Sequence, residues 1–127
     1  PVSAQNTGLE KGHYQLILSH MLLNNIPSDE IKARVIIEAA SLLRANGEAR
    51  FVAWNRDANP DILKDEVRNG PVVGAIKYLQ SQGLVKPGKV LKFSQVQDEW
   101  EDGNPYYHVY YSVRFIRTSK RRPNQAR

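Results

Sequence analysis

The sequence predicts one α+β domain, and three observations support that prediction. Apolar residues recur at helical spacing from residue 31 to residue 43. Two short helical segments, 59–68 and 71–82, are divided by an Asn-Gly-Pro break. A run at 106–117 alternates apolar and more polar residues, which is typical of a half-buried strand. A chain of 127 residues is long enough to enclose one hydrophobic core.

The first 25 residues divide into a polar part and an apolar part. Residues 1–12 are polar and contain glycine, so we expect a flexible arm. The next segment, 13–25, is crowded with apolar residues, and Ile17 and Met21 lie four positions apart. This spacing predicts a short, largely buried additional helix at 13–25.

The clearest helix of the sequence begins at Ser28. A serine side chain can accept the hydrogen bond of a free backbone N–H at a helix start, so Ser28 is the expected N-cap. Asn46-Gly47 is expected to end this helix, because glycine adopts a left-handed turn at low cost. A short strand at 48–54 and a turn at 55–58 are expected next.

Two helices and a hairpin complete the expected domain, which covers residues 13–117. Asn59 is the expected cap of the first helix, and Pro71 opens the second, which Gly83 ends. Strands are predicted at 90–97 and 106–117, joined by an acidic tip that contains Asp-Gly. The remaining segment, 118–127, has almost no apolar content and is expected to be a disordered basic tail.

The most specific local pattern is Leu79-Gln-Ser-Gln-Gly-Leu-Val85, in which a leucine, a helix-breaking glycine and two strand residues follow one another. Together with the order of elements from residue 28 to residue 117, it resembles the winged helix superfamily. The resemblance implies a winged helix-type domain with an extra N-terminal helix and a long C-terminal hairpin. It also implies DNA binding, with helix 71–82 in the major groove.

The positive charge of the chain is concentrated at its C-terminal end. The net charge is +5, and six basic residues and no acid lie from Arg114 onward, which leaves −1 for residues 1–113. Basic segments of this kind bind nucleic acid backbones through counterion release. The positive charge that favours a nucleic acid partner therefore lies in the tail, and the rest of the chain is nearly neutral.

We therefore expect a DNA-binding protein, acting as a small transcriptional regulator or as a replication or partition accessory factor. Duplex is favoured over single strands, and a homodimer is expected. The predicted nucleic-acid-binding residues are Asn69, Val73, Lys77, Gln80, Tyr106, Tyr110, Arg114, Arg117, Lys120, Arg121 and Arg122. Val73 is included because a small apolar side chain can touch a thymine methyl group.

Two features favour other functions. The first turns of helix 71–82 are apolar, and the hairpin tip carries four acids where a DNA-binding wing needs cations. The first alternative is thus a protein–protein interaction module, with its partner at helix 71–82 or at the acidic tip. The second is single-stranded nucleic acid binding, with bases stacked on Tyr106 and Tyr110.

Enzymatic activity is not expected from this sequence. His13, His20 and His108 have no metal-ligand spacing, and the carboxylates at 57–66 fit the solvated face of a capped helix. No glycine-rich phosphate loop is present, so neither cofactor nor metal is expected. The chain has no cysteine, no apolar run of about 18 residues and no secretory signal, so we expect a cytoplasmic or nucleoid-associated protein without a membrane partner.

Overall fold

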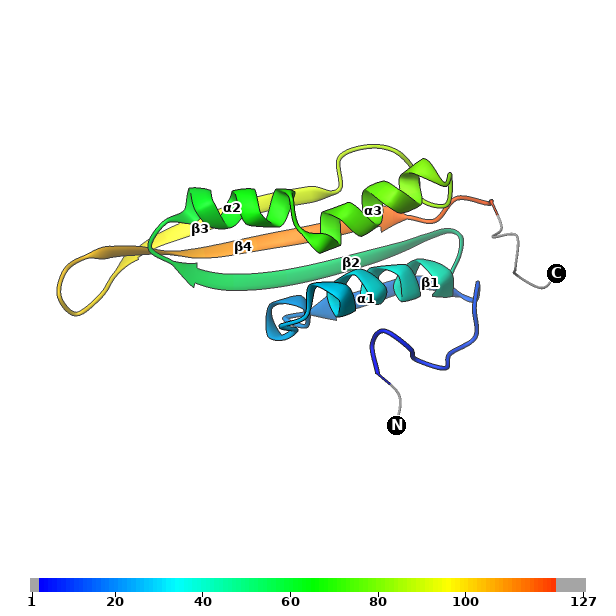
Figure 1. Ribbon diagram of the computed structural model, residues 1–127, viewed down its shortest axis with the longest axis horizontal. Helices are drawn as coiled ribbons and strands as arrows, with labels where there is room; N and C mark the ends of the chain where they lie inside the picture. The colour runs from blue at the N-terminus through cyan, green and yellow to red at the C-terminus, as the bar shows by residue number, and fades with distance from the viewer. Residues whose placement is uncertain (1–2, 121–127) are drawn as a thin grey trace.

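A four-stranded mixed sheet with helices laid on one of its faces forms the fold (Figure 1). The computed structural model describes residues 3–120. The elements, in chain order, are β1 (Tyr14–His20), the 3-10 helix η1 (Leu23–Asn25), α1 (Asp29–Leu42), β2 (Leu43–Asp57), α2 (Pro60–Arg68), α3 (Pro71–Ser81), β3 (Leu91–Glu99) and β4 (Pro105–Ile116). The strand order is β1-β2-β4-β3, in which β1 is parallel to β2 and the other neighbours are antiparallel.

The predicted helix at 13–25 is wrong. Residues 14–20 form β1, and only the single 3-10 turn of η1 follows it. The apolar run is short, and such a run fits a strand as well as a helix until a partner is known. That partner is β2, with Ile17 beside Ala49 and Leu18 beside Arg50 in parallel register. The β1–α1–β2 segment is therefore a parallel crossover unit.

Helix α1 begins as predicted and ends earlier than predicted. The Ser28 hydroxyl oxygen accepts a hydrogen bond from the Ile31 N–H at 3.3 Å, so this N-cap is confirmed. The helix stops at Leu42, and β2 starts directly at Leu43. Asn46 and Gly47 lie in an irregularity of the β1–β2 pairing, where the register shifts, and Asn46 has a φ of 65°. Asn46 and Gly47 therefore lie within strand β2 and do not end the helix.

Helices α2 and α3 follow the predicted boundaries closely. The Asn59 side chain accepts from the Ile62 N–H at 3.4 Å, and Gly83, with a φ of 72°, follows the end of α3. One face of helix α3 is buried, because its apolar side chains pack against α1 and the sheet. These buried side chains are Val72, Val73, Ala75, Ile76 and Leu79.

The winged helix class is contradicted by this arrangement. The parallel β1–α1–β2 unit supplies half of the sheet, and the hairpin strand β4 is inserted between β2 and β3. Val73 is 5% exposed and cannot reach a thymine methyl group. A recognition helix must present one face to a duplex, whereas the apolar face of α3 is used in the core. The sequence pattern of α3 reflects packing against the sheet and α1.

The core lies between the helices and the sheet. Strands β2 and β4 contribute alternate residues, and Phe51 stacks on Phe115 with ring centroids 6.4 Å apart. Val109, Tyr111, Val113 and Phe115 of β4 are buried, as the alternation predicted. None of the helices within residues 3–120 is long and apolar enough to cross a membrane.

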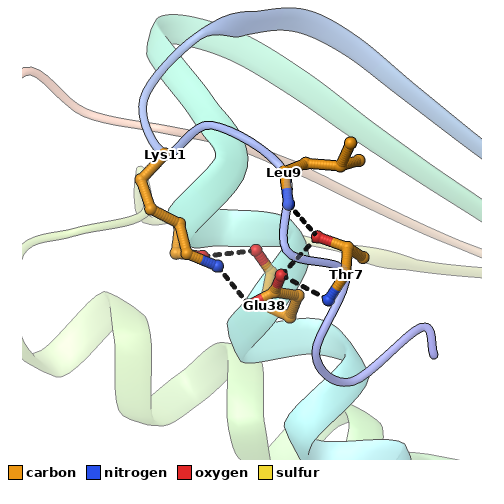
Figure 2. Close-up of polar contacts among 5 residues, drawn as sticks. Thr7, Leu9, Lys11 and Glu38 are labelled. Carbon is orange, nitrogen blue, oxygen red and sulfur yellow. Dashed lines mark hydrogen bonds and ion pairs between the residues drawn. The ribbon is translucent and has the colours of Figure 1, made fainter. Parts of the chain in front are cut away.

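The segment before β1 is attached to α1 through Glu38 (Figure 2). One carboxylate oxygen of Glu38 accepts from the Thr7 N–H at 3.0 Å and from the Thr7 hydroxyl at 2.6 Å. The other accepts from Lys11 Nζ at 2.5 Å. Burial raises the pKa of Glu38, but the bonds from Lys11 and Thr7 together outweigh it and hold the pKa below its ordinary value.

Protonation of Glu38 is therefore expected to release this segment. A carboxylate with a lowered folded-state pKa contributes stability above its unfolded pKa and loses that contribution as the pH falls through the folded value. We expect the Thr7 amide resonance to shift in the acid range, below the usual pKa of a glutamate. Glu38→Gln should give the low-pH spectrum at neutral pH. Glu30→Gln on the exposed part of the same helix is the control, and an equal effect of both variants would contradict the tether.

Candidate functional site

One face of the sheet carries no helix within residues 3–120. The three helices α1, α2 and α3 all lie over the other face (Figure 1). On this uncovered face, which we call the open face, Leu16, Leu18 and Val96 are 50%, 67% and 60% exposed. A parallel strand pair with an uncovered face is unusual, because parallel sheets are normally covered on both sides. The open face is thus the place to look for a ligand or a covering element.

An aromatic cluster occupies the open face where β2 and the β3–β4 hairpin extend beyond β1. Antiparallel pairing places Trp54 beside Tyr110, and Trp54 also stacks on His108 with centroids 5.7 Å apart. Trp100 stacks on Tyr106 at 4.0 Å, and Tyr106 meets His108 edge to face at 5.2 Å. We call these five residues the aromatic cluster. It joins β2 to the β3–β4 hairpin, which is distant from β2 in the sequence.

The guanidinium group of Arg56 lies within the aromatic cluster. Its central carbon is 5.5 Å from the Trp54 ring centroid, 5.8 Å from that of Trp100 and 5.5 Å from that of Tyr106. Ring faces attract cations at these distances. The cluster therefore provides a surface that favours positive charge.

Asp98 is the acid of the cluster. It accepts a hydrogen bond from the Tyr106 hydroxyl at 3.0 Å and lies 3.2 Å from His108 Nε2. The Glu99 backbone N–H, then His108 and then Tyr106 lower the pKa of Asp98. Burial and the bond to Asp98 raise the pKa of Tyr106. Asp98 thus remains ionised in the middle pH range and orients both ring partners.

A second group of polar atoms lies at the carboxyl end of β1. The Met21 N–H donates to the Val52 carbonyl at 2.7 Å, and Met21 turns the chain with a φ of 61°. Among residues 3–120, Asn24 Oδ1 and Trp54 Nε1 are buried side-chain atoms without a hydrogen-bond partner. Val52 pairs with His20, and Trp54 follows two residues later on the same face. A buried polar atom without a partner requires an explanation, and a bound ligand is one.

The carboxyl end of β1 is also where the fold predicts a ligand. In open α/β sheets, ligands bind outside the carboxyl ends of parallel strands. The candidate functional site is therefore the carboxyl end of β1 together with the adjoining aromatic cluster. Its polar groups are His20, Asn24, Trp54, Asp98, Tyr106 and His108.

The structure divides the residues predicted to bind nucleic acid among several places. Tyr106 and Tyr110 belong to the aromatic cluster, although Tyr106 is only 7% exposed because Trp100 stacks on it. Lys77 and Gln80 line a groove beside α3, and Val73, which is 5% exposed, lies at the base of the same groove. The Asn69 side chain donates to the Asp65 carbonyl at the end of α2.

The basic residues near the C-terminus are used partly inside the fold. Arg117 is 5% exposed and donates to the Leu84 carbonyl at 3.0 Å. Lys120 Nζ donates to the Gln82 carbonyl at 2.7 Å, and Arg114 pairs with Glu48 on the open face. The predicted contacts Arg121 and Arg122 lie outside the described residues, as does most of the expected tail at 118–127.

Sequence reasoning assigned no role to most of the candidate site. Trp54 was part of a short strand, Trp100 part of the acidic tip, and Asn24 the end of a helix that does not form. Only the aromatic content of β4 indicated a surface of interest. The register of three strands was needed to place Trp54, His108 and Asp98 together.

Comparisons with solved structures associate this fold with methyltransferases. A putative methyltransferase from Bacillus halodurans matches with a TM-score of 0.59 and 11% identity over 93% of this chain and 70% of its own. A SAM-dependent methyltransferase from Methanosarcina mazei matches at 0.53 and 10% over 93% and 66%. N-methyltransferase NodS from Bradyrhizobium japonicum matches at 0.51 and 13% over 91% and 52%. The fold is one that these methyltransferases share.

These likenesses correct the functional expectations. The neighbours are methyltransferases and not winged helix proteins, so the expectations of a DNA-binding regulator, of a DNA partner and of a chain that is not an enzyme are overturned. The protein-interaction and single-strand alternatives fit these neighbours no better. At 10 to 13% identity the likeness establishes the fold alone. No family model and no curated protein matches the sequence.

The described residues do not form a complete site for S-adenosylmethionine. Nucleotide-type ligands in α/β sheets are held by a glycine-rich turn after a strand and by an acid that binds the ribose. The turn after β1, residues 21–28, contains neither glycine nor acid. The chain also spans only 66% and 52% of the M. mazei protein and NodS. The rest of such a site has no counterpart in residues 3–120.

Proposed function

We propose that this chain forms part of an S-adenosylmethionine-dependent methyltransferase and contributes the substrate side of its site. The observation that carries the proposal is the fold likeness, which extends over more than 90% of the chain in each of three methyltransferases. The cofactor would supply an electrophilic methyl group. The glycine-rich turn that holds it would come from residues beyond these 127.

The geometry of the candidate site supports a substrate-facing role. Asn24 Oδ1 offers an acceptor and Trp54 Nε1 a donor at the carboxyl end of β1, and neither has a partner among the described residues. The aromatic cluster beside them adds ring surface and the Asp98 carboxylate, which accepts a hydrogen bond from Tyr106. A polar substrate that hydrogen-bonds to these groups and has a lone pair on its methyl-accepting atom is the class that they suit.

The exposed apolar residues of the open face support the proposal that residues beyond this chain complete the site. Leu16 and Leu18 are exposed on the edge strand β1, where a larger methyltransferase-type domain would cover them. We include a cytoplasmic location in this proposal, because a chain without cysteine is compatible with a reducing compartment.

Photochemical crosslinking with tritiated S-adenosylmethionine tests the proposal. Each crosslink is permanent, so labelled protein accumulates even when the cofactor binds weakly. Binding to part of a cofactor site is therefore detectable. We expect label on residues 20–25 or on Trp54, with at least a fivefold decrease in the presence of excess S-adenosylhomocysteine. Asn24→Ala should reduce the label by a similar factor.

Asn104→Ala at the exposed hairpin tip is the matched control and should leave the label unchanged. Label that S-adenosylhomocysteine does not compete for, or that Asn24→Ala does not reduce, would count against the proposal.

A further inference from the structure

A groove on the helix side of the sheet, remote from the candidate site, is lined by cations over an apolar floor. It lies between α2, α3 and the start of β3, and β3 is at the opposite sheet edge from β1. Its volume is about 610 Å³, within the range of small-molecule sites. The lining residues are Arg68, Val73, Lys77, Gln80, Gly88, Lys89, Val90, Leu91, Lys92 and Phe93.

The charged side chains of the groove are all positive. Arg68, Lys77 and Lys89 contribute three positive charges, and no acid is among the lining residues. The Lys92 side chain alternates with those of Leu91 and Phe93 and lies on the open face, so its charge lies outside the groove. Arg68 pairs with Asp65 at 3.0 Å, but both side chains are more than half exposed and such a pair is weak. Within residues 3–120 Lys77 and Lys89 have no ion-pair partner. Like charges gathered in this way repel one another, so an anion bound among them relieves that repulsion.

The apolar floor of the groove indicates that the ligand also has an apolar part. Val90, Leu91 and Phe93 are partly buried, and Phe93 lies under the Arg68 guanidinium group at 5.2 Å. An anion without an apolar part would leave this floor in water. An apolar body placed on it gains about 25 cal/mol for each Å² of apolar surface removed from water.

The wall of the groove is held in place by Gln80. Its side-chain nitrogen donates to the carbonyls of Lys86 and Gly88, each at 3.2 Å. These two bonds fix the loop between α3 and β3, which carries Lys89. The groove is therefore largely formed before a ligand arrives, which reduces the ordering cost of binding.

We propose that this groove binds a small soluble anion with an aromatic or aliphatic body, such as an aryl phosphate. The cations contact the anionic group, and the body lies on Val90, Leu91 and Phe93. A hollow of this volume suits a small molecule better than a flat membrane surface. The inference is independent of the proposed methyltransferase function, because no residue of the groove belongs to the candidate site.

Calorimetry of the full chain with 1-naphthyl phosphate tests this inference. We expect saturable one-to-one binding, with inorganic phosphate at least tenfold weaker because it lacks the apolar body. 1-Naphthol should also bind at least tenfold more weakly, because it lacks the charge. Chemical shift changes should be concentrated in residues 68–93. Binding should weaken at high salt, since screening acts on exposed cations.

The double variant Lys77→Ala, Lys89→Ala should weaken binding of 1-naphthyl phosphate by at least tenfold. The double variant Lys32→Ala, Lys64→Ala removes the same net charge from outside the groove and should bind as the unmodified chain does. Equal affinity of the two variants, absence of saturable binding, or binding only to vesicles of phosphatidylglycerol would overturn the proposal. Excess S-adenosylhomocysteine should not displace the probe, which separates this site from the proposed methyltransferase site.

Discussion

Replacement of Phe115 by alanine is expected to lower the free energy of unfolding by about 3 to 5 kcal/mol, the usual cost of emptying an aromatic core position. Phe115 is 2% exposed, lies on the internal strand β4 and stacks on Phe51. Its cross-strand neighbour Ala49 is too small to fill the space. Urea unfolding at neutral pH measures the loss as a decrease in the midpoint at an unchanged slope.

Tyr78→Ala provides the matched control for this measurement. Tyr78 is also aromatic, but it is 56% exposed on α3, so its removal should change the stability by no more than about 0.5 kcal/mol. Similar losses in the two variants would contradict the assignment of Phe115 to the core.

Gly47→Ala is expected to destabilise the chain by about 1 to 3 kcal/mol, the cost of inserting a group where no space exists. A Cβ atom at this position would lie 2.8 Å from the Tyr14 carbonyl oxygen and 2.9 Å from that of Arg44. Both contacts are with backbone, so relief requires a displacement of β1 from β2. Urea unfolding measures the loss, and amide exchange of β1 should increase more than that of β3.

Gly74→Ala should act in the opposite direction. Gly74 lies within α3, and no atom lies within 4 Å of an added Cβ. Alanine in a helix interior is favoured over glycine by about 0.5 to 1 kcal/mol. A destabilised Gly74→Ala, or an unaffected Gly47→Ala, would show that the backbone packing differs from that described above.

The sequence predicted where helices α1, α2 and α3 begin, because those signals are local. Ser28 and Asn59 cap helices α1 and α2, as their side-chain chemistry indicates, and α3 begins at Pro71. The hairpin was also predicted, with boundaries within two residues of β3 and β4. Caps, prolines and alternation all act over a few residues, so the chain itself contains the information.

The segment at 13–25 failed because its local pattern was ambiguous. A run of apolar residues fits either a helix or a strand buried by neighbours, and only the pairing of β1 with β2 decides between them. The parallel orientation of that pair then excludes the winged helix class. A winged helix and the present fold contain a similar order of elements from residue 28 onward, so element order did not distinguish them.

The role of helix 71–82 was wrong for a related reason. Its boundaries were correct, but an apolar stripe does not specify which surface covers it. The structure places Val72, Ile76 and Leu79 in the core and leaves Lys77 on the groove. The apolar first turns of this helix are therefore a consequence of burial.

The candidate site could not be assembled from the sequence. Trp54 and His108 are more than 50 positions apart in the sequence. They meet because β2 and β4 are antiparallel neighbours, in a register that places Arg56 opposite His108. A shift of one residue in that register would move every side chain of β4 to the other face. Nothing in the local sequence fixes this register.

By itself, the sequence determined the starts of helices α1, α2 and α3, the hairpin and the position of the excess positive charge. These depend on backbone hydrogen bonds and side chains within a few residues of one another. The tertiary structure alone decided the parallel pairing of β1, the open face, the aromatic cluster and the cationic groove. Each of these depends on which distant surfaces bury one another, and burial is a property of the whole fold.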